Sequence, residues 1–432
     1  MPDQSIASIL LIGSFAVFIV IRMPICFGLA ISTGITMFYL NIPIMTLVQQ
    51  MSKSICNFSL MAIPLFIVAG EIMGVGGISD RLLLFSQVLV GRFRGGLSYV
   101  TVLASMFFGG ISGSAVADVS SLGSIVIPLM EKAGYEKPFA VGLTVTAGCQ
   151  GVLVPPSHNM IIYSVAAGGV SIGALFAAGI IPGIICGAGL IVVAIYFSIT
   201  KHYPKGEPAS FKQIVVATKD AILALMTAFI IFFGIVSGMF TATESGAVAC
   251  IYAFVISAFV YKELTIKKMH KVLMSSVKTL SLVFGLIATA GAFGWVMSYL
   301  RIPTTLTHTL LSFSDNTIVI LMIINIMLLL LGCFMDMAPL ILICTPILLP
   351  VVTALGMSPI QFGVLLMFNL GIGLCTPPVG SALFVGCGIG KISMEKAAKA
   401  MLPMFGSMVI GLLLVTYVPA FSMWLPHFLG YK

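Results

Sequence analysis

The chain has 432 residues, of which 59% are hydrophobic and only 8% are charged, and its mean hydropathy is +1.18. Soluble globular proteins carry about 25% charged residues, so this composition excludes a soluble protein and predicts a multi-pass α-helical membrane protein. The formal net charge of +8 requires no acidic partner, because cytoplasmic loops of membrane proteins accumulate Lys and Arg. The first apolar run, residues 6–21, leads into further apolar runs, so we expect a membrane helix there and not a signal peptide.

The sequence lacks the usual motifs of ATP and metal chemistry. The nine cysteines are scattered, mostly through apolar segments, and fit neither a disulfide framework nor a Cys-x-x-Cys metal site. No Gly-x-x-x-x-Gly-Lys-Ser/Thr loop for a nucleotide phosphate is present. A pump built from this chain would therefore need an energy source other than bound ATP.

Apolar runs predict the membrane helices in chain order. Two runs are too long for a single crossing and are interrupted at their middle by small or polar residues, Gly109–Ala115 and Gly332–Pro339. We interpret each as a re-entrant hairpin, in which one helix enters, the chain turns at mid-depth and a second helix returns. The apolar runs are residues 5–21, 25–40, 60–77, 97–130, 139–168, 172–199, 221–238, 243–261, 279–299, 316–352, 360–389 and 402–424.

Three more polar segments connect these runs. For residues 41–57 we expect an interfacial helix on the outer face of the membrane. The alternative is that this segment binds another subunit. Residues 201–220 contain Pro and Gly and predict the main cytoplasmic connector. Residues 262–278 are rich in Lys and predict a basic cytoplasmic helix or loop.

The pattern Gly-x-x-x-Pro-Pro occurs at Gly151–Pro156 and again at Gly373–Pro378, 222 positions later. Proline removes a backbone donor and clashes with the preceding turn, so both membrane helices should break there. A broken helix is tolerated in hydrocarbon only where its free carbonyls are buried in protein or line a cavity. Matched breaks in two halves of a chain point to the central binding site of a transporter.

The same offset relates other landmarks of the two halves. Each half runs hairpin, short turn, then broken helix. The matching pairs are Pro128 with Pro350, Gly134 with Gly356, and Pro155 with Pro377.

Charge placement predicts that the two repeats are inverted. The mouth of the first hairpin is basic and should face the cytoplasm, whereas the mouth of the second carries Asp315 and should face outward. When the other helices are traced across the membrane from this hairpin, 18 of the 21 basic residues lie on the cytoplasmic side. The exceptions are Lys53, Arg301 and Lys432, and both termini lie on the outer side. Basic residues at the first mouth are Arg92, Arg94, Lys132 and Lys137.

These observations predict an all-α inverted-repeat transporter of the elevator type. We expect N-terminal scaffold helices in residues 1–90 and further scaffold helices with cytoplasmic connectors in residues 201–300. Residues 91–200 hold the first transport repeat, with hairpin 97–130, broken helix 139–168 and the following helix. Residues 301–400 hold the second, with hairpin 316–352 and broken helix 360–389, and residues 401–432 form a C-terminal helix.

Each hairpin tip should meet a break and offer hydroxyls and carbonyls to a hard cation. One patch of Ser and Gly would be explained by close helix packing alone, but its recurrence beside a second break favours two cation sites. The candidate cation-binding residues are Ser112, Ser114, Gly151 and Pro155 in the first site, and Gly332, Gly373 and Thr376 in the second.

An anionic substrate should lie between these two cation sites. No Arg or Lys lies at mid-membrane depth, so hydroxyls, amides, helix dipoles and bound cations would hold it. The candidate substrate-binding residues are Ser114, Ser157, Asn159, Asp336 and Ser381.

Four acidic residues lie in or beside membrane segments, where an unpaired carboxylate is costly. Asp336 lies at a hairpin tip and is the first choice for the transport site. Asp118 lies one turn beyond the other tip and could equally cap the returning helix. For Glu71 and Glu244 we expect structural hydrogen bonds or subunit contacts.

In these motifs the chain resembles the large membrane subunit of tripartite ATP-independent periplasmic (TRAP) transporters. The resemblance covers nearly the whole chain. Its motifs are Ile63–Phe66, Ala69–Met73, Gly110–Ala115 with Asp118, Val154–Ser157, Ala242–Ser245 and Thr376–Gly380.

The resemblance implies a sodium-driven elevator-type importer of organic anions in a bacterial inner membrane, with no organic cofactor and no nucleic-acid partner. It implies two partners, a small four-helix membrane subunit on a separate chain and a soluble periplasmic substrate-binding protein. Members carry C4-dicarboxylates, sialic acid, other sugar acids and keto acids. The segment Val379–Gly386 is similar to the sialic-acid branch, which favours sialic acid or another sugar acid over a C4-dicarboxylate.

The sequence leaves three alternative functions. A stand-alone sodium/carboxylate symporter would need no binding protein, and co-purification of a small subunit would distinguish it. An intramembrane enzyme would need an activated nucleophile, but Ser114 with Asp118 is the sole candidate pair and has no His or Lys near it in the sequence. A passive channel fits poorly, because inverted broken-helix repeats suggest alternating access.

Overall fold

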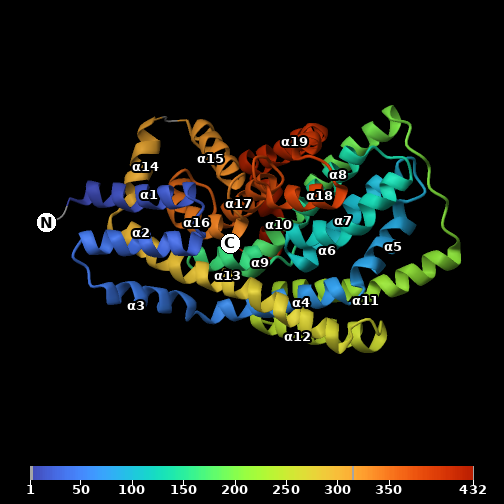
Figure 1. Ribbon diagram of the computed structural model, residues 1–432, viewed down its shortest axis with the longest axis horizontal. Helices are drawn as coiled ribbons and strands as arrows, with labels where there is room; N and C mark the ends of the chain where they lie inside the picture. Colours follow the sequence, from blue (N-terminus) through green and yellow to red (C-terminus); the bar gives the residue numbers. More distant parts are fainter. Residues whose placement is uncertain (1–2, 314–315, 432) are drawn as a thin grey trace.

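The computed structural model describes residues 3–313 and 316–431, and its regular elements are helices (Figure 1). Asp315 and Lys432, used above to place charges, lie outside the described residues. Seven helices of the described chain are long and apolar enough to cross a membrane. The prediction of an all-α multi-pass protein is therefore confirmed.

Five helices and one short 3₁₀ segment precede the first hairpin. Pro24 and Pro43 directly precede the second and third helices, where a fixed φ suits a helix start. These elements are α1 (Gln4–Val20), α2 (Ile25–Tyr39), α3 (Ile44–Ile55), η1 (Phe58–Met61), α4 (Ala62–Val75) and α5 (Ile78–Val90).

Both predicted hairpins and both predicted breaks are present. The first hairpin pairs α6 (Gly96–Ser112) with α7 (Ala115–Lys132), and the second pairs α15 (Thr317–Gly332) with α16 (Met337–Ala354). The Pro-Pro pairs fall between consecutive half-helices, as their chemistry requires. The first broken helix comprises α8 (Lys137–Gly151) and α9 (His158–Ala166), and the second comprises α17 (Pro359–Leu374) and α18 (Ser381–Gly390).

The remaining helices connect and follow these units. They are α10 (Ile172–Thr200), α11 (Phe211–Val236), α12 (Ala242–Val255) with its π-helical continuation η2 (Ile256–Val260), α13 (Ile266–Tyr299), α14 (Ile302–Phe313), α19 (Met394–Tyr417) and α20 (Ala420–Phe428).

Several helix bounds differ from the apolar runs. The basic segment 262–278 does not form a separate element, because most of it is the first part of the 34-residue helix α13. Lysine is a good helix former, so hydropathy underestimates the length of a helix that leaves the membrane. Helices α5 and α14 are absent from the apolar runs because polar residues interrupt their apolar pattern, among them Asp80 and Arg81 in α5 and Thr305 and His308 in α14. Residues 402–424 were one apolar run, but the helix is interrupted there by Val418 and Pro419.

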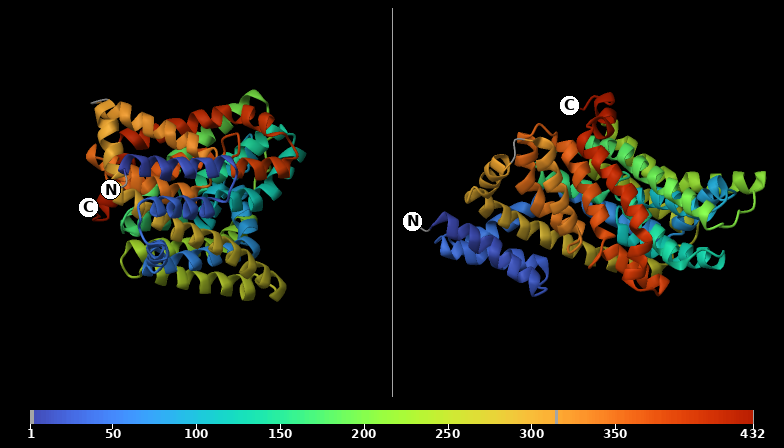
Figure 2. Two further views of the ribbon diagram at one scale, coloured as in Figure 1. Left: turned by 60° about the vertical axis from the view of Figure 1, so that its left-hand side comes forward. Right: turned by 90° about the horizontal axis from the view of Figure 1, so that it is seen from above.

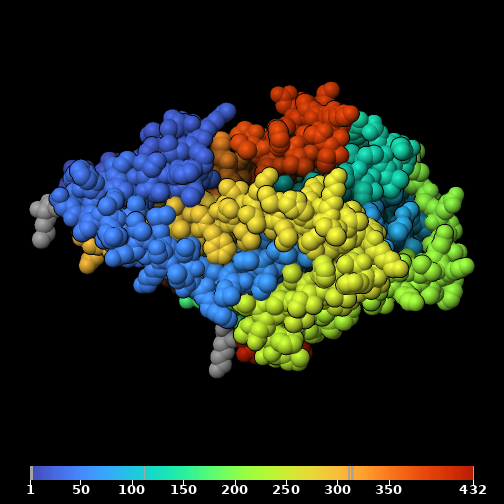
Figure 3. Space-filling view, turned by 60° about the horizontal axis from the view of Figure 1, so that its bottom comes forward, coloured from blue at the N-terminus to red at the C-terminus, as the bar shows by residue number. Residues whose placement is uncertain are grey.

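Two groups of helices lie against each other. Helix α13 packs along α2, α3 and α4, and α4 also packs against α12. Figure 3 shows the N-terminal helices and the segment around α13 side by side on one face. The hairpins and half-helices form the other group, in which α16 packs on α9 and α18 packs on α7 and α8. The two hairpins enter this group from opposite ends of the molecule (Figures 1 and 2).

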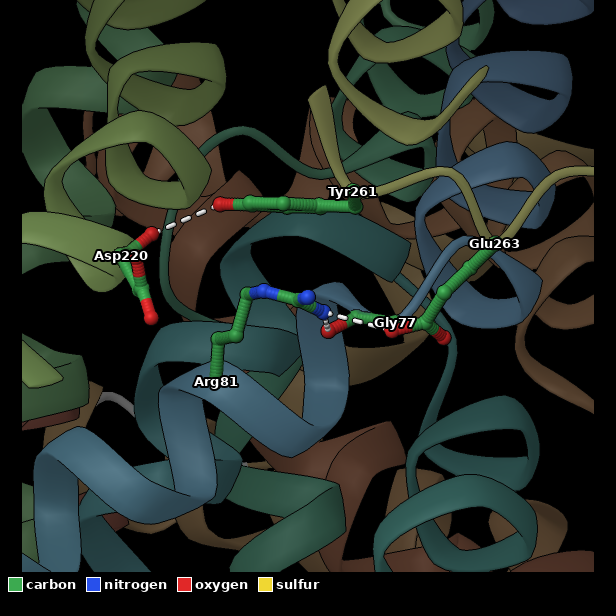
Figure 4. A network of polar contacts seen from close by, with 5 residues as sticks. All are labelled: Gly77, Arg81, Asp220, Tyr261 and Glu263. Carbon is green, nitrogen blue, oxygen red and sulfur yellow. Dashed lines mark hydrogen bonds and ion pairs between the residues drawn. The ribbon is translucent and has the colours of Figure 1, made fainter. Parts of the chain in front are cut away.

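A polar network of five residues is shown in Figure 4. The Arg81 guanidinium donates to the Gly77 carbonyl at 2.7 Å and to Glu263 at 2.9 Å, and stacks 3.6 Å above the centre of the Tyr261 ring. The Tyr261 hydroxyl donates to the Asp220 carbonyl at 2.7 Å. The network joins α5, α11 and the segment after η2.

Candidate functional site

The tip of the first hairpin is fixed by its own hydroxyls. Ser114 caps α7 by accepting the Ala117 N–H at 3.3 Å, and Ser112 accepts the Ser114 N–H at the same distance. Between them Gly113 has a φ of +63° and lies so close to His158 that a side chain would collide with it. The tip is therefore a tight turn that only glycine fits.

This tip is held against the start of the half-helix that follows the first break. The Asn159 amide donates to the Gly113 carbonyl at 3.0 Å. One turn back along α6, Gly109 lies against the backbone of Gly151, and Gly110 lies against the Pro155 carbonyl. The four residues predicted for the first cation site are thus brought to one place, where the hairpin meets the break.

The second hairpin meets the second break in a related way. Asp336 caps α16 by accepting the Met337 N–H at 2.9 Å. The Cys333 carbonyl accepts the N–H groups of Val379 and Gly380, at 3.3 and 3.4 Å. A Cβ added to Gly373 would lie 2.6 Å from the Gly332 Cα, so these two backbones touch.

Thr376 lies at the second break, beside this glycine contact. Its hydroxyl donates to the Ile372 carbonyl at 2.7 Å, and its N–H donates to the Gly373 carbonyl at 3.0 Å. The Thr376 oxygen keeps its lone pairs, and such an oxygen can bind a cation. The residues predicted for the second cation site are therefore also neighbours.

A cavity of about 560 Å³ lies between the two helix groups, at the hairpin tips. Three of the five predicted substrate residues line it: Ser114, Asn159 and Asp336. Ser157 and Ser381 do not line it. Their hydroxyls are buried and have no hydrogen-bond partner among the described residues, so both are placed inside the packed half-helices.

The N-termini of α7, α9 and α16 all open onto this cavity, which is lined by Ala115, His158 and Met337. Helix N-termini carry a partial positive charge and unpaired N–H groups, so three of them favour an anion in the cavity. No Lys or Arg of the described chain lines the cavity, whereas the carboxylates of Glu71 and Asp336 do.

Glu71 and His158 are among the cavity residues that were not predicted as site residues. Glu71 was expected to make a structural hydrogen bond, and it does accept one from the Ser275 hydroxyl at 3.0 Å. It nevertheless faces the cavity, with Gly70 and Gly74 of the same helix. His158 begins α9, directly after the first break.

Asp118 is the other carboxylate that lies near the predicted sites. Its side chain is 0% exposed, and neither oxygen has a hydrogen-bond partner within the described residues. It does not cap α7, because Ser114 does. It lies beside Gly148 and Gly151 at the first break. A buried carboxylate without a partner is costly, so this position calls for a cation or a proton.

Comparison with known proteins identifies this architecture. The sequence profile of the family described as "Tripartite ATP-independent periplasmic transporter, DctM component" matches residues 12–421, nearly the whole chain. The chain belongs to this family. As a TRAP permease it is a transporter component and not an enzyme.

Individual relatives match over most of this chain. The protein YgiK of Salmonella typhimurium is 42% identical over 97% of this chain and 97% of its own. The isethionate TRAP transporter permease protein DctMQ of Oleidesulfovibrio alaskensis is 39% identical over 96% of this chain and 65% of that longer protein. The sialic acid TRAP transporter large permease protein SiaM of Vibrio cholerae is 40% identical over 89% of this chain and 90% of its own.

Solved structures agree on the fold. The YdaH transporter of Alcanivorax borkumensis superposes with a TM-score of 0.63 over 88% of each chain, at 12% sequence identity. Identity this low supports a shared transporter fold and carries no information on substrate. The TRAP permease is thus a multi-pass membrane transporter built from hairpins and broken helices.

Proposed function

We propose that this TRAP permease is the large membrane subunit of a sodium-coupled importer of an organic anion, with sialic acid or another sugar acid favoured over a C4-dicarboxylate. The observation that supports an anionic substrate is the cavity onto which the N-termini of α7, α9 and α16 open. Helix N-termini attract anionic groups. Ser114 and Asn159 would supply hydrogen bonds, and Asp336 would bind a substrate hydroxyl or a cation.

Sodium coupling is supported by the two places where a hairpin touches a break. In each, two glycines allow backbone contact, and hydroxyls and carbonyls gather there. The first site would use Ser112, Ser114, Gly151 and Pro155, with the Asp118 carboxylate close by. The second would use Gly332, Gly373 and Thr376. Oxygen ligands of this kind suit a hard cation.

For the movement itself we propose an elevator. Helices α6–α9 and α15–α18 would form the transport domain, which slides against a scaffold of α1–α5 and α11–α13. The two repeats of the transport domain lie within residues 91–200 and 301–400. The cavity lies between the two helix groups, which is where alternating access would expose it to one side and then the other.

The family description names a tripartite system, so we propose a small membrane subunit and a periplasmic binding protein as partners. The protein would lie in a bacterial inner membrane with both termini in the periplasm, because basic residues then face the cytoplasm. Lys137–Glu131 and Lys201–Glu136 ion pairs lie at the predicted cytoplasmic end. The test is a reporter enzyme that works only in the cytoplasm, fused to either terminus. Activity of this fused reporter would contradict the orientation.

The deciding experiment is uptake of radiolabelled sialic acid into proteoliposomes that contain the chain and its small subunit. The binding protein and an inward sodium gradient are each supplied or omitted. We expect uptake only when both are supplied. Gradient-driven uptake without the binding protein would indicate a stand-alone symporter. Uptake without sodium would refute the coupling, and absence of sialic acid uptake would direct the test to other sugar acids and dicarboxylates.

A further inference from the structure

We propose that Glu71 is an electrostatic coupling residue, whose charge on the scaffold wall opposes movement of the anionic substrate without sodium. The proposal rests on the sodium-coupled import proposed above. It concerns a residue outside the candidate cation and substrate sets. It follows from the position, partners and charge of one carboxylate.

Glu71 lies on α4, a helix of the scaffold group that also contacts the hairpin group. Helix α4 packs against α12 and α13 on one side and against α6 and α9 on the other. The Glu71 side chain lines the cavity on the scaffold wall, with Gly70, Gly74 and Thr279. The opposite wall carries the hairpin tips, with Ser114 and Asp336. In an elevator the substrate would move past this carboxylate.

The Glu71 carboxylate has no cationic partner in the described chain. Its one hydrogen bond comes from the neutral Ser275 hydroxyl on α13, at 3.0 Å, and the ion pairs of the described residues do not include it. Glu263, near the end of the same helix group, is by contrast paired with Arg81 at 2.9 Å. The Glu71 carboxylate thus lines the cavity without a cationic side chain of the described residues paired to it.

The consequence for transport follows from Coulomb's law. Two unit charges about 10 Å apart at an effective dielectric constant of about 20 interact strongly enough to change a population roughly tenfold. A transport domain that carries the anion alone brings further negative charge past Glu71 and is disfavoured. With sodium ions bound the domain carries less negative charge past Glu71, and the penalty falls. The carboxylate therefore discriminates against the anion alone, but not against sodium alone.

A purely structural role for Glu71 makes a different prediction. In that case the hydrogen bond between α4 and α13 matters, and the charge does not. Two variants separate these roles. Glu71→Gln removes the charge and keeps an acceptor for Ser275, whereas Ser275→Ala removes the hydrogen bond and keeps the charge.

The experiment uses the complete transporter in proteoliposomes and the substrate that the wild type imports. Exchange of labelled for unlabelled substrate is measured with sodium on both sides and with choline in its place. For Glu71→Gln we expect sodium-free exchange about tenfold above wild type, with exchange in sodium changed less than about twofold. Glu71→Met is a second neutral variant of similar volume, should the glutamine variant not purify. Ser275→Ala and Glu71→Asp should keep wild-type sodium dependence.

The proposal would be overturned if both neutral variants exchanged substrate without sodium no faster than the wild type does. So would a rise in Ser275→Ala equal to that in Glu71→Gln, because the hydrogen bond would then be responsible. Failure of the proposed function is seen separately, in the wild type. If the wild type exchanges substrate as fast in choline as in sodium, transport is not coupled to sodium and the proposed function itself is wrong.

Discussion

The two hairpin–break units have the same plan but place their acidic residues differently. The second unit has Asp336 as the cap of α16, facing the cavity. The first has the neutral Ser114 at the equivalent position and instead carries Asp118, one turn further on and fully buried beside the break. The equivalent of Asp118 in the second unit is Leu340. Each unit therefore has one carboxylate near its hairpin tip and break. That of the second unit lies in the cavity and that of the first lies behind it, which suggests that the units divide their tasks.

The largest effect is expected at the cavity. Asp336→Ala should abolish uptake, because it removes both the cap of α16 and the hairpin carboxylate that faces the substrate. Loss of an N-cap alone costs about 1 kcal/mol, so Asp336→Ser, which can still cap, separates the two roles. Uptake and membrane expression are measured for both variants. Normal uptake by Asp336→Ala would remove this residue from the site.

The buried carboxylate of the first unit should affect sodium more than substrate. Asp118→Asn keeps the shape and removes the charge, so we expect the sodium concentration for half-maximal uptake to rise about tenfold. The sodium-free protein should at the same time melt at a higher temperature, because an unpaired buried charge costs several kcal/mol. A variant with unchanged sodium dependence and a lower melting temperature would show that Asp118 serves packing alone.

The glycine contacts of the two units can be broken one at a time. Gly373→Ala places a Cβ against Gly332, and such overpacking costs about 1–3 kcal/mol. We expect a melting temperature several degrees lower and a clear loss of uptake. Gly388→Ala, in the neighbouring half-helix α18, is the matched control because no atom lies within 4 Å of its added Cβ. Equal behaviour of the two variants would contradict a close backbone contact.

The smallest effect is expected from single hydroxyls. Thr376→Ala should raise the sodium concentration for half-maximal uptake about three- to tenfold, the value of one hydrogen-bond-sized interaction. Thr376→Ser should restore it, and Ser112→Ala makes the same test in the first unit. Sodium titration of uptake measures all three. An unchanged titration for Thr376→Ala would argue against a cation site in the second unit.

The sequence predicted the plan of these units because backbone chemistry determines it. Pro-Pro pairs prevent a continuous helix, and the small residues at Gly109–Ala115 permit a tight turn. Which side chains face the cavity was harder to predict. Glu71 lies on a helix with partners on two sides, so its direction depends on packing. Ser157 was expected in the cavity because it follows a break, but it is buried within the half-helix junction.

The π-helical segment η2 has a consequence for the register of the chain. The Tyr261 N–H donates to the Ile256 carbonyl, five residues back. This turn therefore contains one more residue than an α-helical turn. Each α-helical residue rotates a side chain by about 100°. Deleting one residue within Ile256–Val260 leaves an α-helical turn and should keep Tyr261 and Glu263 beside Arg81, whereas inserting one residue there should turn them away. An insertion in this turn should therefore be tolerated far less than a single deletion, and a scan of both with melting temperature as the readout would show it.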